Sequence, residues 1–164
     1  MSTLTRARVI PAPSSKVWAV LRDFAGVHRW HPKVETSPLL SDNNEGLGAT
    51  RVCHFYDGTS VKERVVEYRE GESMKIELSE FSMPLHRASA TLTVRATSTK
   101  MTEVTMQMDY DVKFGPLGWI MSSLMIQPMM GKMFEKVLGS LEHHLVTGEL
   151  IGRDGEHIRP AAAF

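Results

Sequence analysis

Histidine is the residue type here best suited to catalysis or metal binding, and its spacing carries no metal motif. His28 and His31 lie three residues apart, and His143 and His144 are adjacent. Neither pair has a cysteine or carboxylate at a spacing used for zinc, and neighbouring residues on a helix point to different faces. We therefore interpret these histidines as surface residues and predict no metal site.

The candidate nucleophiles lack the partners that would activate them. The sequence has no Gly-x-Ser-x-Gly segment, and its single cysteine, Cys53, has no obvious neighbouring base. Thiol reactivity requires the thiolate, so we interpret Cys53 as an inert buried residue. There is also no glycine-rich loop of the kind that holds phosphate groups, and we expect no cofactor.

Methionine is the unusual part of the composition. Eight of the eleven methionines fall between Met101 and Met133. Methionine is flexible and polarizable, so a cluster of them suits a surface that adapts to apolar molecules, while a single one also fits an ordinary core. Met125, Met129 and Met133 recur at every fourth position of a helical segment and should project along one ridge.

Turn residues and hydrophobic periodicity predict the helices and strands that would position these residues. Residues 3–11 are predicted as a strand, followed by a helix from Ser14 and a shorter helical piece that stops before Pro32. Six further strands are predicted at residues 34–40, 49–56, 60–68, 74–81, 85–97 and 101–113. The last two alternate apolar and polar side chains, which indicates an antiparallel sheet that is wet on one face and covered on the other.

A long helix should cover the dry face of this sheet. Helical periodicity runs from Gly115 to about Val146, and Pro128 should bend the helix near residues 125–127 because proline removes a backbone hydrogen bond. Beyond the bend, the apolar stripe consists of Met130, Phe134, Val137, Leu138, Leu141 and Leu145. The predicted class is α+β, with a curved antiparallel sheet wrapped around a long C-terminal helix.

Composition limits the kinds of partner. Lys plus Arg equals Asp plus Glu, at 19 each, so the net charge is zero and no nucleic acid is expected to bind. The N-terminal residues lack the apolar run of a signal peptide, and residues 117–130 are too short to span a bilayer, so we expect no stable membrane insertion. We predict one cytoplasmic domain at residues 1–148, as a monomer or homodimer, with a loose tail at 149–164.

Several local motifs occur in an order found in a known superfamily. They are Ala12-Pro13, Val17-Trp18, Leu21 to Phe24, Val27 to Pro32, Gly48 to Arg51, Asp57-Gly58 and Lys62 to Arg64. Together they resemble the START-like superfamily, most closely its bacterial polyketide cyclase/dehydrase-type ligand-binding branch, over residues 3–148. The resemblance implies a helix-grip fold: a seven-stranded sheet, two short helices after the first strand, and a cavity between the sheet and the last helix.

The resemblance also implies which side chains line that cavity. By similarity to the hormone-receptor branch of the superfamily, Arg51, Cys53 and Phe55 face inward, and strand alternation extends this face. Small Ala88 and Ala90 would leave space opposite the methionines, as a site for a small apolar ligand requires. The predicted ligand-binding residues are Glu35, Arg51, Cys53, Phe55, Val61, Glu63, Ile76, Leu78, Ala88, Ala90, Met106, Met108, Tyr110, Met125, Met129 and Met133.

Two of the predicted ligand-binding residues are glutamates. Glu63 corresponds to a glutamate that faces the cavity in the receptor branch, and burial would disfavour its charge unless a cation such as Arg51 lies close. A structural Glu63–Arg51 pair that closes one cavity end is an equal alternative. Glu35 takes the place of a receptor lysine that grips a carboxylate, so we expect a neutral or hydroxylated ligand, unless Glu35 is a solvated surface residue.

Two functions follow from the resemblance and from the missing catalytic motifs. The first is binding or transport of a small hydrophobic molecule that is lipid-like, quinone-like or polyketide-like. The alternative is a polyketide cyclase/dehydratase-type enzyme, which holds a reactive chain and assists with one acid–base group, for which Glu63, Tyr110 and Arg51 are candidates. A protein-interaction module is a third possibility, and it is disfavoured because we see no large apolar stripe for the surface.

Overall fold

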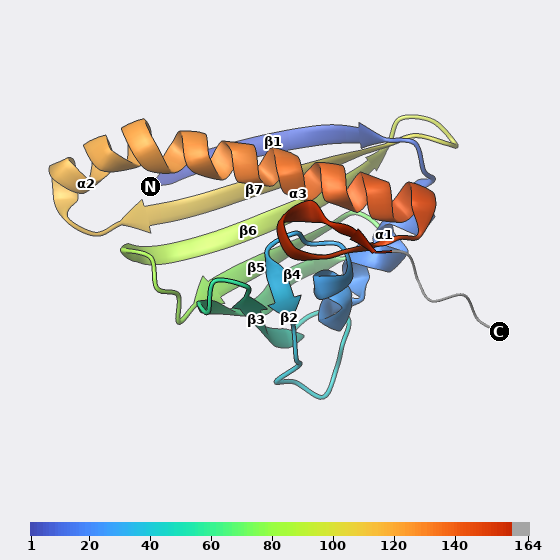
Figure 1. Ribbon diagram of the computed structural model, residues 1–164, viewed down its shortest axis with the longest axis horizontal. Coiled ribbons are helices and arrows are strands. Elements are labelled where there is room, and N and C mark those ends of the chain that lie inside the picture. Colours follow the sequence, from blue (N-terminus) through green and yellow to red (C-terminus); the bar gives the residue numbers. More distant parts are fainter. Residues whose placement is uncertain (159–164) are drawn as a thin grey trace.

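The computed structural model of the protein describes residues 1–158 and consists of one curved sheet with a long helix across its concave face (Figure 1). The chain begins with strand β1 (Ser2–Ile10), followed by helix α1 (Ser14–Arg22) and the 3-10 helix η1 (Phe24–Arg29). These are the two short helices that the sequence predicted after the first strand. They cover one end of the sheet and bury Val17, Trp18 and Phe24 in the core.

Six further strands complete an antiparallel sheet whose spatial order is β1-β7-β6-β5-β4-β3-β2. Their bounds are β2 (Val34–Thr36), β3 (Thr50–Phe55), β4 (Ser60–Arg69), β5 (Ser73–Ser79), β6 (Leu85–Ala96) and β7 (Thr102–Val112). The seven-stranded sheet confirms the predicted α+β helix-grip class. The prediction for β2 was too long, because the Ser37 hydroxyl donates to the carbonyl of Ala25, 2.6 Å away, and Pro38 has no N–H for the ladder.

The C-terminal helical region is divided where the proline predicted a bend. It consists of α2 (Gly115–Met121), a π-helical turn η2 (Ser122–Ile126) and α3 (Gln127–Thr147). Pro128 lies in the first turn of α3, directly after the π turn, so its missing N–H falls at the junction of the two helical segments. Gly148 ends α3 with a φ of 72°, the left-handed conformation that glycine adopts without steric cost.

Helix α3 is fixed over β1, at one edge of the sheet. Two arginines of β1 reach up to it: Arg6 pairs with Glu135, and Arg8 pairs with Glu142. A glycine makes room for the guanidinium group of Arg6, since a Cβ on Gly131 would lie 2.4 Å from Arg6 Nη2. All six residues of the predicted apolar stripe are buried. The helix therefore packs closely against β1 and lies farther from the middle strands.

The residues after α3 fold back onto the domain. We expected a loose tail from residue 149 to 164, but strands β8 (Leu150–Ile151) and β9 (His157–Ile158) form a small hairpin around the 3-10 turn η3 (Arg153–Gly155). Ile151 is buried, and the Asp154 N–H donates to the carbonyl of Pro32. The tail prediction was thus wrong for 149–158, and residues 159–164 lie outside the described residues.

The stripe on α3 gives a stability prediction. Leu141 is 1% exposed in the main core, whereas Val146, on the same helix, is 55% exposed. We expect Leu141→Ala to lower the free energy of unfolding by about 2–5 kcal/mol, because it removes buried methyl groups and leaves a cavity. Val146→Ala is the control and should change it by less than about 0.5 kcal/mol. Urea denaturation of the two variants tests this, and equal losses would contradict the packing described.

Candidate ligand-binding site

The concave face of the sheet collects most of the residues predicted to bind a ligand. Cross-strand partners place Arg51 opposite Glu63, Glu63 opposite Leu78, and Leu78 opposite Ala88. Residues directly opposite each other in a ladder point to the same face. The same register continues over β7, so one face carries Arg51, Cys53, Phe55, Val61, Glu63, Ile76, Leu78, Ala88, Ala90, Met106, Met108 and Tyr110.

The interior between this face and α3 is divided into two separate groups of buried residues. The larger group lies around α1, η1 and the C-terminal half of α3, and includes Trp18, Phe24 and Leu141. The smaller group lies at the other end, and includes Tyr110 and Phe134. Four apolar residues pack against both groups and yet remain only partly buried: Leu78, Phe81, Met106 and Met133.

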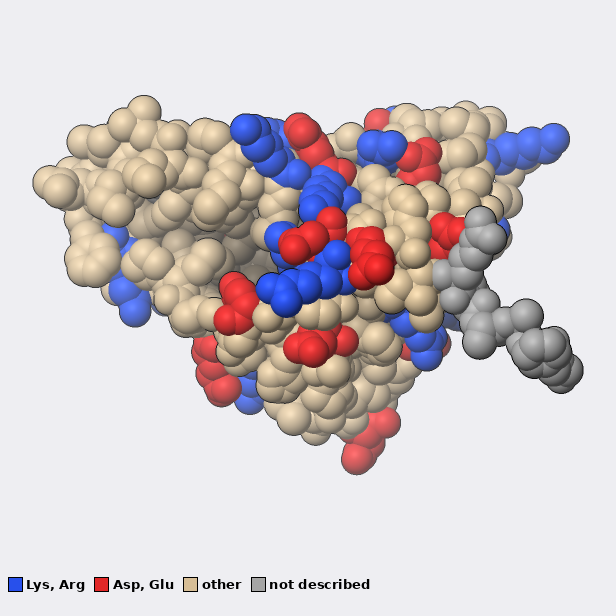
Figure 2. Space-filling model, viewed as in Figure 1, with Lys and Arg blue, Asp and Glu red and all other residues tan. Residues whose placement is uncertain are grey.

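These four residues mark a hollow between the sheet and the helix. Along β6, inward-facing Ala88 and Leu92 are buried, while Ala90 between them keeps exposed surface. On β7, Met106 also keeps exposed surface, whereas its neighbours on the same face, Val104 and Met108, are buried. Exposure is thus retained in the middle of the concave face. Figure 2 shows the molecule hollowed beneath the first half of α3.

Phe81 is a lining residue that the sequence did not reveal. It follows β5, and Glu80 before it has a φ of 53°, which breaks the strand alternation. An inward position for Phe81 could therefore not be counted from Ile76 and Leu78. The sequence indicated only that Phe81 is the last apolar residue of the predicted strand at residues 74–81.

The methionine ridge of the helix reaches the hollow at one position only. Met133 is partly buried against both groups, but Met125 is 68% and Met129 is 63% exposed. The expected inward ridge of three methionines is wrong for these two. Met125 lies in the π turn, whose longer repeat breaks the four-residue spacing. Met129 lies one helical turn before Met133, nearer the open end of the helix.

Glu35 does not contribute to the interior. Its neighbour Val34 is buried and pairs with Phe55 of the concave face, so Glu35 points to the other side and is exposed. The placement of Glu35 in the cavity is therefore corrected, and the alternative of a solvated surface glutamate describes it. Glu35 therefore gives no indication of the charge of a ligand.

Arg51 and Glu63 form a buried ion pair on the concave face. Arg51 Nε donates to Glu63 Oε2 at 2.7 Å, and Arg51 Nη1 donates to the carbonyl of Phe24 at 2.6 Å. The guanidinium also lies 3.7 Å from the centre of the Phe24 ring. The pair therefore links β3 and β4 to η1. These contacts satisfy much of the hydrogen-bonding capacity of Arg51 and fix the carboxylate of Glu63 in place.

The surroundings of this pair keep its neighbours neutral. Burial, together with the negative charge of Glu63, raises the pKa of the Cys53 thiol to about 12. Burial lowers the pKa of His31 to about 4, with Glu63 opposing the shift and Arg51 adding to it. His31 Nδ1 accepts the N–H of Lys33, 3.1 Å away. The thiol of Cys53 is therefore a poor nucleophile, as the sequence predicted, while His31 is a partly buried, neutral imidazole.

An apolar surface lies beside the hollow, at the open end of the molecule. Its exposed residues are Phe114, Leu117, Trp119, Ile120, Met121, Leu124, Met125 and Met129, which belong to or flank α2, η2 and the start of α3. The corresponding end of Figure 2 shows an extended area without charged side chains. Our expectation of no large exposed apolar stripe was wrong, because the π turn and α2 extend beyond the sheet that would cover them.

A second depression lies on the opposite, convex face and differs in character. It is an open groove of about 640 Å³. It runs across β5, β6 and β7 and includes the outward-facing Lys75, Glu77, Ser89 and Asp109. Its lining also includes Phe81 and three residues of the concave-face set, Leu78, Ala88 and Tyr110. Charged and hydroxyl groups predominate among its outward-facing side chains, so it lacks the mostly apolar lining of a typical small-molecule site. The hollow under α3 is the better candidate.

The fold and the hollow define a helix-grip protein of the small-ligand-binding class. The family model described as "Polyketide cyclase / dehydrase and lipid transport" matches residues 1–146, and the chain belongs to this family. None of the curated proteins matches the sequence. Within residues 1–158, no helix is long and apolar enough to cross a membrane.

Several solved structures share the architecture. A solution structure from Thermobifida fusca is 27% identical, with a TM-score of 0.71, covering 88% of this chain and 93% of that one. The protein XoxI from Bacillus cereus is 17% identical, with a TM-score of 0.74 and coverages of 90% and 97%. The ZhuI aromatase/cyclase from a Streptomyces species is 14% identical, with a TM-score of 0.68 and coverages of 90% and 97%. The last two likenesses, at such low identity, show the fold alone.

His31 gives a prediction for the pH dependence of stability. Its pKa is about 4 in the folded protein and near 6.5 when unfolded, so the unfolded chain takes up the proton first as the pH falls. Stability should decline between about pH 6.5 and pH 4, by on the order of 3 kcal/mol from this group. The variant His31→Asn keeps an acceptor for the Lys33 N–H but cannot titrate. Urea denaturation from pH 7 to pH 4 should show a shallower decline in the variant, and identical slopes would exclude this role for His31.

Proposed function

We propose that this protein binds or transports a small hydrophobic molecule in the hollow between α3 and the concave face of the sheet. The observation that carries the proposal is the pair of separate buried groups bridged by Leu78, Phe81, Met106 and Met133, which lie inside the fold but are not fully packed. A mostly apolar lining with one fixed polar pair is the usual composition of a small-molecule site. The proposed contacts are these four residues with Ala90, and the other predicted concave-face residues form the walls.

The lining favours a flexible or variable apolar ligand. Met106 of the sheet and Met133 of the helix both pack against the two buried groups, and methionine side chains adapt to different shapes. The apolar surface of the open end adjoins the same flank of α3 through Met129. An apolar molecule entering there would remain in contact with apolar side chains. This arrangement supports a lipid-like, quinone-like or polyketide-like ligand. We propose, separately, that the protein acts in the cytoplasm as a monomer or homodimer.

Filling the hollow should abolish binding without loss of the fold. In Ala90→Leu, the larger side chain should occupy ligand space and weaken binding of an apolar fluorescent probe by at least about tenfold, while stability is kept or raised. Ala7→Leu is the control, because Ala7 is exposed and faces away from the helix. Displacement titrations with a ligand panel and urea denaturation provide the measurements. If Ala90→Leu destabilised the protein by about 1–3 kcal/mol and left probe binding intact, the interior would be solidly packed and the proposal would fail.

A polyketide cyclase/dehydratase-type activity is the second candidate, and the fixed Glu63 carboxylate favours it. Arg51 holds Glu63 on the concave face, and Cys53 lies 3.5 Å from the same carboxylate oxygen. Leu78, opposite Glu63 in the ladder, belongs to the hollow lining, so the carboxylate lies next to the proposed ligand space. An acid–base group beside a constrained reactive chain could direct its cyclisation or dehydration. Arg51 and Tyr110 are the other candidates on this face.

The variant Glu63→Gln distinguishes the two functions. If the protein is an enzyme, the substitution should lower the turnover of a poly-β-ketone substrate by about 10²–10⁴-fold while apolar probe binding remains, because the amide cannot exchange a proton. If the protein only binds, the wild type should convert no such substrate. Turnover is followed by product analysis, with circular dichroism as the check on folding. Unchanged turnover in the variant would remove Glu63 from the mechanism.

A further inference from the structure

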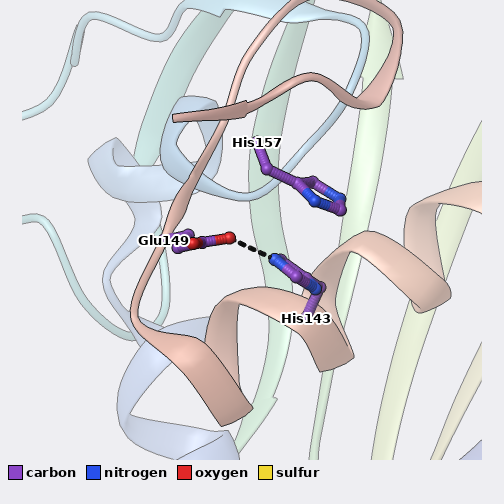
Figure 3. Close-up of side chains that lie close together, drawn as sticks. All are labelled: His143, Glu149 and His157. Atoms are coloured by element: carbon purple, nitrogen blue, oxygen red, sulfur yellow. Dashed lines mark hydrogen bonds and ion pairs between the residues drawn. The ribbon is translucent and has the colours of Figure 1, made fainter. Parts of the chain in front are cut away.

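A cluster of two histidines and a glutamate lies where the C-terminal hairpin meets α3. His143 is in the last turns of α3, Glu149 follows the helix, and His157 is in β9 (Figure 3). One donor atom from each residue lies within 4.8 Å of the other two. His143 Nε2 is 2.6 Å from Glu149 Oε2, and the rings of His143 and His157 are stacked with centres 3.7 Å apart.

The backbone holds these three residues in place. Gly148 reverses the chain, and the Glu149 N–H then donates to the hydroxyl of Thr147. The ring of His144 bonds to the carbonyl of Glu149 at 2.8 Å. His157 is placed by its ladder partner Ile151, which is buried. The cluster is thus set by the local fold, and residues that position the ligands of a metal in this way contribute to its affinity.

The chemistry of the cluster matches a transition-metal site. Two imidazoles and one carboxylate are a ligand set used for zinc, and they leave one coordination position open. Ligands of one tetrahedral zinc lie about 3.3 Å apart, given bonds of about 2.0–2.1 Å, so the present donors must approach one another, and the stacked ring of His157 must turn until its in-plane lone pair points to the ion. His157 is exposed and has room to make this movement. The proton shared by His143 and Glu149 would pass to the other ring nitrogen of His143 or to solvent.

The electrostatic surroundings allow a cation to bind. The nearest cationic side chain of the neighbouring depression is that of Arg8, and it is paired with Glu142 at 2.5 Å. This depression has a volume of about 440 Å³ and is lined by both histidines together with Arg8, Pro11, Gly139 and Glu142. It gives water or a small ligand access to the open coordination position.

We propose that His143, Glu149 and His157 bind a divalent transition metal of the zinc type, which fastens the C-terminal hairpin to α3. The hairpin also bonds to the segment after η1, where Lys33 Nζ lies 2.6 Å from Asp154 Oδ1. A metal would therefore restrain α3 relative to the small helices at this end of the grip. Glu149 and His157 lie beyond residues 1–146, the part matched by the family model, whereas His143 lies within it.

Metal titration of the untagged, chelator-treated chain tests this proposal. We expect one equivalent of Co²⁺ to bind with the visible absorption of a four-coordinate site, and Zn²⁺ to displace it. His157→Ala and Glu149→Gln should each weaken Zn²⁺ binding by at least about tenfold in calorimetry, since even residues that only support a ligand cost that much. His86→Ala is the matched control, because His86 is an exposed histidine on β6 and should leave the affinity unchanged.

Hydrogen exchange adds a readout that does not depend on affinity alone. Zn²⁺ should slow amide exchange across residues 149–158 in the wild type but not in His157→Ala. Without metal, His157→Ala should have the same thermal stability as the wild type. Equal Zn²⁺ affinity in the wild type and His157→Ala, or the same loss in His86→Ala, would show surface binding by scattered histidines and overturn the proposal. Absence of Zn²⁺ binding to the wild type would overturn it as well.

Discussion

The position of α3 over β1 is the constraint on which the rest of the structure depends. Arg6 and Arg8 pair with glutamates of the helix, and the guanidinium group of Arg6 occupies the space left by Gly131. Exposed ion pairs contribute little free energy, so their main effect is to set where the helix lies. The buried stripe provides the stabilisation. Because the helix is held at one edge, the middle strands of the curved sheet are not in close contact with it.

The hollow follows from this off-centre position and from side-chain size. At the C-terminal end of α3, the small helices α1 and η1 add enough apolar side chains to fill the interior. At the other end, Tyr110 and Phe134 belong to a smaller packed group. Between them Ala90 is too small, and Met106 and Met133 are too flexible, to close the gap completely. Protein interiors normally pack to high density, so incomplete packing at one place in an otherwise dense fold is the observation behind the proposed ligand site.

The buried polar groups act on the same region. Arg51 and Glu63 satisfy each other at the base of the concave face and join the sheet to η1. A buried pair of this kind adds little net stability but is costly to break, so it fixes geometry. Burial in the same region raises the pKa of the Cys53 thiol and lowers that of His31, so both groups are neutral. The interior thus presents one fixed carboxylate in an otherwise apolar environment, which suits a binding site and also a single acid–base group.

The sequence alone determined the strands of the main sheet except the length of β2, and also the apolar stripe of α3, the break at Pro128 and the concave face from Arg51 to Tyr110. Alternation and helical periodicity depend on neighbouring residues of the chain. Tertiary structure decided the rest. Met125 and Met129 are exposed because the π turn and the end of the sheet, not their spacing, set their surroundings. Glu35 faces outward because Val34 before it pairs with Phe55 of the concave face. His143 meets Glu149 and His157 only because the chain reverses at Gly148, and no spacing rule for metal ligands anticipates that contact.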